Sequence, residues 1–324
     1  MMKKKLAVGI TLGAILVYLS IRGINFQDVS RGFKTIRYEY VLLVLTIMFM
    51  IQVMKSLRWG LILSPIVKVD QLSLFSVTSV GFLAILAVPA RVGELARPYL
   101  ITKKCHIQMS AAIGTIIVER VFDCLTVLLI FLLALFFTPF PPWLIRSGIV
   151  FFLITLVILI GIIFMILKRE ATIRALNSTC RRLPERYTRK LNHLFHQFID
   201  GFKIITEPKL LFYVIFLSAV TWLMDVAAIY FMFLAFSLAV PLAAPFVVMI
   251  ILMIGISIPA APGFVGNWHY SCILGLSLFG IPKAEALTFS VIFHVICVGI
   301  IIILGLMFLP SNKFSLSDLS QQEN

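Results

Sequence analysis

Charged side chains are scarce in this sequence: they make up 13% of its 324 residues, whereas 61% of the residues are apolar. No polar stretch is long enough to fold as a separate soluble domain, since the longest covers only residues 168–209. A water-soluble fold could not hide that much apolar surface. The shortage of charge therefore predicts an all-α integral membrane protein in which helices satisfy the backbone polar groups within the bilayer.

Signatures of several other protein classes are also missing. The five cysteines are scattered and odd in number, with no C-x-x-C pair, so neither a disulfide framework nor a zinc site is indicated. No H-E-x-x-H, G-x-S-x-G or P-loop motif occurs. Glu119 and Asp123 lie one helical turn apart, but the adjacent Arg120 makes them a poor metal site. We therefore expect no enzymatic activity, no cofactor and no bound metal.

Long apolar runs dominate what is present. A helix needs roughly 20 mostly apolar residues to cross a hydrocarbon layer of about 30 Å. Eight runs approach that length, at residues 6–21, 40–63, 72–89, 110–137, 147–167, 210–236, 245–259 and 286–309. The first run follows three lysines and has no small-residue cleavage site after it. It is therefore expected to be an uncleaved span and not a secretory signal.

Positive charge collects beside these runs. The formal net charge of +14 would suggest nucleic acid as a partner of a soluble protein. Here the basic residues flank spans, as in loops that face an anionic cytoplasmic leaflet, so we expect no nucleic-acid partner. Residues 168–209 carry ten Lys or Arg and are predicted to be cytoplasmic. Residues 26–40 alternate apolar and basic positions at helical spacing, which predicts an amphipathic helix on the membrane surface.

Two apolar runs are interrupted by proline and glycine, at residues 88–98 and 258–267. If each enters the membrane and returns on the same side, the amino terminus, residues 168–209 and the carboxyl terminus all become cytoplasmic. The alternative is eight simple spans with an external amino terminus. That alternative also places the basic segment inside, but it exposes Lys3, Lys4 and Lys5 on the unfavourable side.

The re-entrant assignment divides the single membrane domain into two similar halves, residues 1–137 and 138–309, followed by a polar tail at 310–324. Each half then contains two spans, a hairpin and a third span, in opposite orientations. The predicted fold is thus six full spans plus two re-entrant hairpins in an inverted repeat. Paired interrupted segments at matching positions mark the central site of many transporters, because broken backbone at depth must line a cavity or be buried.

Ionisable residues concentrate at the first interruption and in the apolar run after it. They are Arg91, Glu94, Arg97, Glu119, Arg120 and Asp123. Each charge costs about 2.5–3.5 kcal/mol at the bilayer centre on insertion scales, so these groups must face one another or a wet cavity. Because a guanidinium binds phosphate oxygens in pairs, the set predicts a phosphate-binding site. The alternative is an ion-pair network that only locks the hairpin to the next span.

The second interruption contains Pro262, Gly263, Gly266 and Asn267. Backbone N–H groups at the start of a half-helix there could bind an anion, although such a cluster also occurs at kinks and tight packing contacts. The weaker candidates are single polar residues within apolar runs, namely Arg58, Asp225, His269 and His294. Arg58 precedes Trp59 at the end of a run, a pattern more typical of an interfacial anchor.

These patterns resemble the membrane region of bacterial lysylphosphatidylglycerol synthases and its stand-alone, flippase-like relatives. The resemblance covers almost the whole chain. It rests on P-x-R-x-G-E-x-x-R at residues 89–97, on Glu119-Arg120 with Asp123, and on the Pro-Gly-x-x-Gly element at residues 262–266. The Pro-Gly-x-x-Gly element departs from the family, which usually has Gly-Gly-x-Gly followed by an acidic residue. In this sequence Phe264 replaces a glycine, and His269 stands where the acidic residue would be.

The resemblance implies a lipid flippase of the plasma (inner) membrane. In the larger relatives this region is similar to a flippase that moves an aminoacylated phospholipid after a soluble domain has made it, and this chain has no such domain. The expected partner is therefore a lipid with a phosphate head group, either a phospholipid, an aminoacyl-phospholipid or a polyprenyl-phosphate carrier. A second copy of the chain or a membrane enzyme is the expected protein partner. The alternative function is a scaffold that presents lipid to a membrane-bound transferase without transporting it.

Overall fold

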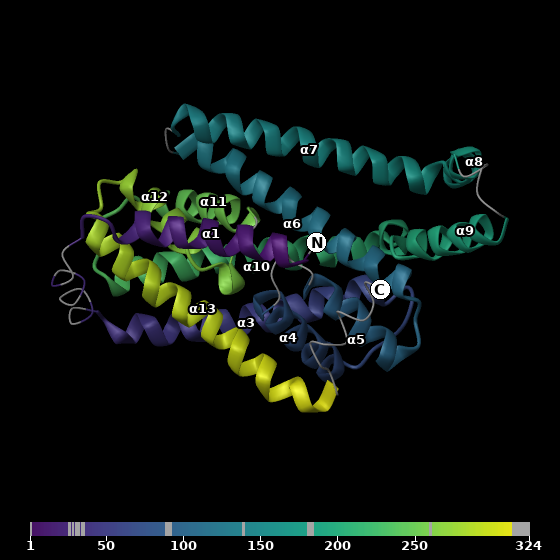
Figure 1. Cartoon of the computed structure of the whole chain (residues 1–324), viewed down its shortest axis with the longest axis horizontal. Helices are drawn as coiled ribbons and strands as arrows, with labels where there is room; N and C mark the ends of the chain where they lie inside the picture. The colour runs from purple at the N-terminus through teal and green to yellow at the C-terminus, as the bar shows by residue number, and fades with distance from the viewer. Residues whose placement is uncertain are drawn as a thin grey trace.

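The computed structural model describes residues 2–24, 27, 29, 33, 36–87, 93–137, 140–179, 185–258 and 261–312. These residues form twelve α-helices and short 3-10 turns, with no strand among them (Figure 1). Four helices are long and apolar enough to cross a membrane: α3 (Tyr38–Leu63), α7 (Pro142–Leu167), α10 (Pro208–Ala235) and α13 (Lys283–Asn312). The protein is therefore an all-helical, multi-pass membrane protein, as the composition predicts.

Two further helices coincide with predicted spans. Helix α1 (Met2–Ile21) begins the chain, and α6 (Met109–Phe137) carries the acidic and basic residues of the fourth apolar run. The predicted amphipathic helix over residues 26–40 lies largely outside the described residues, and α3 already begins at Tyr38.

Helices α3 and α10 pack against each other and run antiparallel. At one end the Arg37 N–H donates a 2.9 Å hydrogen bond to the Ala235 carbonyl. Towards the other end Arg58 Nη1 donates to Ser218 Oγ at 3.0 Å. The buried residues of α3 recur every three or four positions, so that one face meets α10 while the opposite face remains apolar and exposed.

The first interrupted run is a helical hairpin of α4 (Gln71–Ala87) and α5 (Ala96–Cys105). At about 1.5 Å per residue both helices are too short to cross a bilayer alone. Gly93 allows the return, because a Cβ there would overlap the carbonyl group of Ala84. The Ser73 N–H donates to Asp70 Oδ2 at the start of α4 and holds the pKa of that carboxyl below its usual value. Lys104, near the end of α5, acts electrostatically on Asp70, so the hairpin ends close to where it began.

The second interrupted run is also a hairpin, of α11 (Ala244–Ser257) and α12 (Asn267–Ser277), joined through the 3-10 turn η3 (Pro262–Phe264). Gly255 faces Ser271, and Gly275 faces Val248, which lets the two helices pack closely. The turn η3 packs on α4 of the first hairpin. The Pro and Gly pattern therefore predicted both hairpins correctly as interruptions of helix.

Helix α1 packs on the second hairpin and is fastened by α13. Gly13 contacts Gly266 so closely that a Cβ on Gly266 would overlap the Gly13 carbonyl group. Lys283 Nζ donates hydrogen bonds of 2.7 Å to the carbonyls of Leu19 and Arg22, at the end of α1. These contacts join the first helix of the chain to its last hairpin and last helix.

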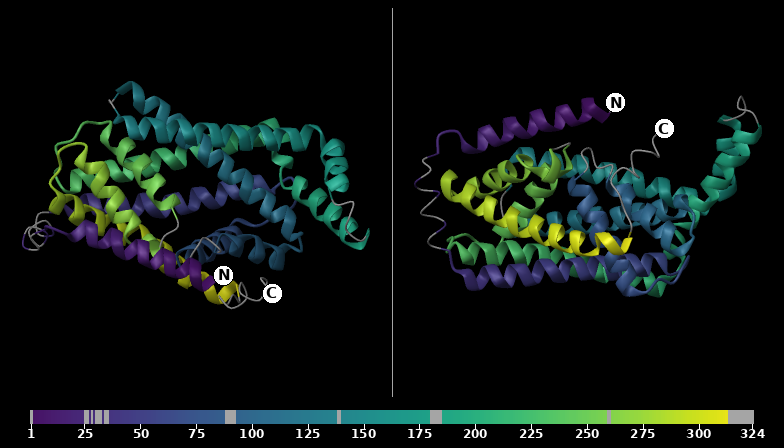
Figure 2. Two further views of the ribbon diagram at one scale, coloured as in Figure 1. Left: turned by 45° about the horizontal axis from the view of Figure 1, so that its top comes forward. Right: turned by 60° about the horizontal axis from the view of Figure 1, so that its bottom comes forward.

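The basic segment forms α8 (Arg169–Thr179), α9 (Glu185–Asp200) and η2 (Lys203–Thr206). Helix α9 docks on the beginning of α6, where Gly114 and Gly201 bring the two backbones together. Figure 2 shows α8 and α9 projecting beyond one end of the bundle, with the start of α1 and the end of α13 directed towards that end. The described ends of the chain thus point towards the end of the molecule that carries the predicted cytoplasmic segment.

Packing contacts recur between the two parts of the chain. Helix α3 packs on α4 as α10 packs on α11, and α5 packs on α6 as α12 packs on α13. Across the bundle, α13 packs on α4 as α6 packs on α11. Each of these contacts therefore has a counterpart in the other part of the chain.

Candidate functional site

Arg97 and Glu119 form the centre of a buried ion-pair network. Two hydrogen bonds of 2.9 Å run from the guanidinium of Arg97, in α5, to the two carboxylate oxygens of Glu119, in α6. Arg97 is 1% exposed and Glu119 is not exposed at all. The guanidinium carbon lies 4.3 Å from the ring centroid of Trp59, whose Nε1 donates to Thr115 Oγ1. Paired and stacked in this way, the two residues fasten the first hairpin to α6.

Arg58 belongs to the same network, although the sequence pattern suggested an interfacial anchor. Its side chain is 1% exposed, and its Nη1 donates to Asp123 Oδ1 at 2.7 Å while Nη2 lies 3.6 Å from Glu119 Oε1. Trp222 Nε1, from α10, also donates to Asp123 Oδ1 at 3.1 Å. The anchor interpretation is wrong because spacing along α3 shows which residues share a face, but not which helices that face meets.

Arg120 differs from its neighbours because its side chain is 42% exposed. Its Nη2 donates to Glu119 Oε1 at 2.8 Å, and its Nη1 lies 3.4 Å from Asp123 Oδ2. The partly buried Glu94, at the hairpin turn, acts on Arg120 electrostatically. Arg91 lies outside the described residues, so its predicted place in this set is not tested.

The network holds spare hydrogen-bond donors. Three guanidinium groups converge on two carboxylates, and the buried Nε atoms of Arg58, Arg97 and Arg120 donate to none of the described residues. Buried N–H groups normally find an acceptor. An incoming anion with several oxygens would supply acceptors to such a site.

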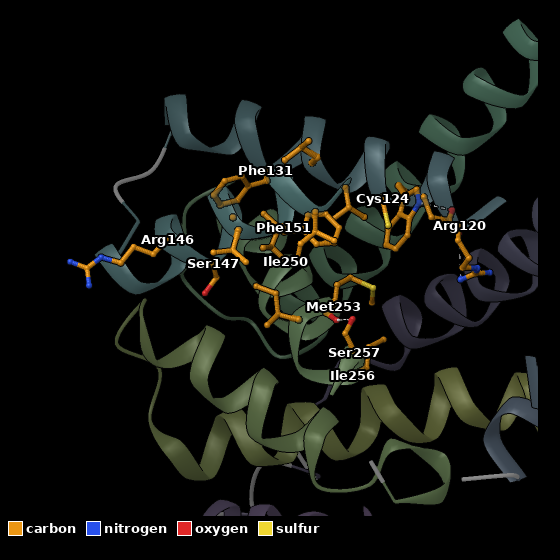
Figure 3. Close-up of a pocket in the computed structure, with 18 residues that line it drawn as sticks. Arg120, Cys124, Phe131, Arg146, Ser147, Phe151, Ile250, Met253, Ile256 and Ser257 are labelled. Carbon is orange, nitrogen blue, oxygen red and sulfur yellow. Dashed lines mark hydrogen bonds and ion pairs between the residues drawn. The ribbon is translucent and has the colours of Figure 1, made fainter. Parts of the chain in front are cut away.

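An apolar cavity of about 620 Å³ opens beside the network, between α6, α7, α10 and α11 (Figure 3). Arg120 lies at one end of it, and Arg146 and Ser147 at the other. Asp123 also lines the cavity. The wall between these ends is mainly apolar and includes Val127, Leu128, Phe131, Phe151, Ile154 and Ile250. Its size falls within the range of about 300–1,000 Å³ that is usual for ligand sites. The cavity thus combines charged side chains at both ends with an apolar wall between them.

The residues of the second interruption lie apart from this network. Gly263 and Gly266 have positive φ values of 68° and 90°, so the glycines serve a turn that side chains would strain. Asn267 Nδ2 donates to the Gly255 and Ile258 carbonyls at the end of α11. No hydrogen bond or ion pair among the described residues joins Pro262, Gly263, Gly266 or Asn267 to the Arg–Glu network.

Two histidines support the same turn. His294 Nε2 donates to the Gly263 carbonyl at 2.8 Å, and His269 Nδ1 lies 3.2 Å from Ser290 Oγ. The two rings meet edge to face, with their centroids 4.9 Å apart. Asp225, the remaining candidate, lies in α10 on the face that meets α3.

Sequence reasoning missed the partners that come from other helices. Ser218 and Trp222 of α10 complete the site through their bonds to Arg58 and Asp123. Apart from Arg146, the residues of α7 and α11 that line the cavity are uncharged, so no charged motif identified them in the sequence. The Arg58-Trp59 pair was the visible signal, since Arg58 bonds to Asp123 and the ring of Trp59 stacks on Arg97.

The fold and this site define a multi-pass helical membrane protein with an intramembrane ion-pair network at the end of an apolar cavity. The chain belongs to the lysylphosphatidylglycerol synthase TM region family, whose model matches residues 6–305.

The chain is also similar to archaeal proteins described as UPF0104 membrane proteins. One from Methanothermobacter thermautotrophicus is 24% identical over 98% of both chains. The UPF0104 membrane protein MJ1078 of Methanocaldococcus jannaschii is 26% identical over 67% of this chain and 89% of its own length. No solved structure matches this one significantly.

Proposed function

We propose that the protein moves a lipid with a phosphate-bearing head group between the two leaflets of the plasma (inner) membrane. The observation that carries the proposal is the junction of the Arg–Glu network with the apolar cavity at the half-exposed Arg120. The phosphate would bind at Arg120, and one hydrocarbon chain would occupy the cavity. A phospholipid, an aminoacyl-phospholipid and a polyprenyl phosphate share this chemistry.

The burial of the arginines supports a division of roles. Arg97 and Arg58 are sealed against carboxylates, so their main effect is to hold α3, α5, α6 and α10 together. Arg120 is bound to the same carboxylates but reaches the cavity. A phosphate oxygen could therefore replace a carboxylate oxygen as the partner of Arg120 while the other two pairs persist.

The recurring packing contacts support the finer topology: an inverted repeat of six full spans and two re-entrant hairpins. By the positive-inside rule, the end that carries α8 and α9 faces the cytoplasm, together with both termini. Arg120 is closer to that end of α6, whereas Arg146 lies at the opposite end of the cavity. A lipid with its head at Arg120 and its chain towards Arg146 is thus oriented like a lipid of the cytoplasmic leaflet.

The test is lipid translocation by the protein in vesicles that contain fluorescent phosphatidylglycerol, with Arg120→Gln as the variant. Hydrogen bonds to charged groups contribute about 1.5–3 kcal/mol, so the variant should lose roughly tenfold or more in rate. Arg174→Gln, on the exposed part of α8, removes the same charge away from the cavity and should behave like the parent. Thermal unfolding of each variant checks that it is folded.

Two outcomes would contradict the proposal. A folded Arg120→Gln protein that moves lipid at the parent rate would exclude binding of the lipid phosphate by Arg120. A parent protein that retains phospholipid through purification but moves none would favour the alternative function, a scaffold that presents lipid to a membrane-bound transferase.

A further inference from the structure

Asp225 is a carboxylate near the middle of the 28-residue helix α10. Its neighbours on the same face are sealed in the interior: Thr221 is 1% exposed, Ala228 not at all, and Ile229 2%. Asp225 itself is only partly buried. A partly buried carboxylate therefore lies on the inner face of a span, where an ionisable residue marks a functional site.

The surroundings of Asp225 contain charges but no fixed partner. Lys55 and Arg58 of α3 and Asp123 of α6 act on it electrostatically, as it acts on Cys297 of α13. Helix α11 has no titratable residue, and α12 contributes Cys272 beside Cys297. Asp225 makes no hydrogen bond or ion pair with any of the described residues. The carboxylate is therefore free to gain and lose a proton without breaking a structural bond.

Its position links this carboxylate to the proposed lipid site. Arg58, which interacts with Asp225, is bonded to Asp123, and Asp123 lies beside Arg120. Neutralising Asp225 removes a negative charge close to these guanidiniums. A phosphate then binds more favourably at Arg120, and by linkage a bound phosphate favours the protonated carboxyl. Asp225 also lies where α10 packs along α3, between the two parts of the chain. Coupling-ion sites occupy such positions in transporters with inverted repeats.

We propose that Asp225 is a proton-binding site that couples lipid movement to the proton gradient across the membrane. Its carboxylate accepts one proton from water on one side and releases it to water on the other, with no other bond made or broken. One proton moving with one monoanionic lipid carries no net charge. This inference rests on the proposed lipid transport, and it adds the ion that drives it.

The experiment uses the full-length protein in phosphatidylglycerol-containing vesicles that enclose a pH-sensitive dye. In the parent, a pH gradient should change the rate of lipid movement severalfold, and lipid movement should carry protons. Asp225→Asn should keep lipid exchange at equal pH, because the carboxamide resembles the protonated acid, and should lose both proton-linked effects. Glu207→Gln, an exposed change at the start of the same helix, should leave both effects intact.

Each failure has a separate meaning. A parent that moves lipid without responding to the gradient overturns the coupling and leaves the transport function standing, whereas a parent that moves no lipid overturns both. A folded Asp225→Asn protein that still responds to the gradient also overturns the coupling. If Asp225→Asn does not accumulate, Lys55→Gln replaces it: loss of the ammonium should shift the pH dependence of lipid movement to higher pH, and an unchanged dependence contradicts the inference.

Discussion

Glu119 is the residue on which the charged network converges. Its fully buried carboxylate lies within 2.9 Å of Arg97, 2.8 Å of Arg120 and 3.6 Å of Arg58. A carboxylate removed from water is tolerated only with such partners, because an unpaired buried charge is very costly. Three helices are therefore held at one point by interactions that each depend on the same two oxygen atoms.

Replacing Arg97 by Gln should destabilise the protein. Breaking a buried pair costs about 3–5 kcal/mol, and the effect should lie near the lower limit because Arg58 and Arg120 remain beside Glu119. Thermal unfolding in detergent, together with the amount of protein inserted, measures the loss.

The double variant Arg97→Gln/Glu119→Gln provides the control. Two carboxamides can bond to each other, and Asp123 still pairs with Arg58 and Arg120, so the double variant should lose less stability than the sum of the losses in Arg97→Gln and Glu119→Gln. Strictly additive losses would show that the two residues are not coupled and would contradict the network.

The first hairpin depends on Gly93, a position where no side chain fits. Replacing Gly93 by Ala would place a Cβ against the backbone of Ala84, which cannot move as a flexible side chain can. Overpacking of this kind costs about 1–3 kcal/mol. We expect a lower melting temperature and weaker lipid movement from Gly93→Ala.

Gly161→Ala is the matched control, because nothing lies within 4 Å of a Cβ at that position of α7. It should be neutral or slightly stabilising, since alanine favours helix more than glycine does. A Gly93→Ala protein as stable as Gly161→Ala would mean that the turn of the hairpin is looser than the structure shows.

The hairpins were predictable from sequence, but their surroundings were not. Proline and glycine within an apolar run report directly on local backbone, so residues 88–98 and 258–267 identified both interruptions. Arg97 and Glu119 carry charges in or beside apolar runs, so each was expected to face an opposite charge, and the sequence predicted that they belong to one cluster. The role of Arg58, and the cavity between α6, α7 and α11, depend on how separate helices assemble, which no local pattern specifies. Asn267 shows the same limit, because its amide bonds to α11.

The basic segment distinguishes one end of the bundle from the other. Helices α8 and α9 project from one end, and Leu242, in the connection between α10 and α11, lies at the other with 73% of its surface exposed. The positive-inside rule orients the first end towards the cytoplasm. The orientation of the termini follows from the same rule and stays a prediction.

Single cysteines at Arg174 and Leu242, in a background free of native cysteine, test this orientation. An impermeant thiol reagent applied outside intact cells should label Leu242→Cys and leave Arg174→Cys unmodified until the membrane is opened. Tags on both termini should be protected in the same way. External labelling at Arg174 would reverse the orientation, and an external amino terminus with a cytoplasmic carboxyl terminus would favour eight simple spans.

The hydrogen bonds between Lys283 and the end of α1 also determine when α1 can be assembled during synthesis. The carbonyls of Leu19 and Arg22 leave the ribosome early, yet the ammonium that caps them is made more than 250 residues later. Gly266, against which Gly13 packs, is also a late residue. During translation α1 must therefore wait in the lipid without its final neighbours, and it docks only when α12 and the start of α13 arrive. Helix α1 is thus made before α3 to α11 but completes its packing after them.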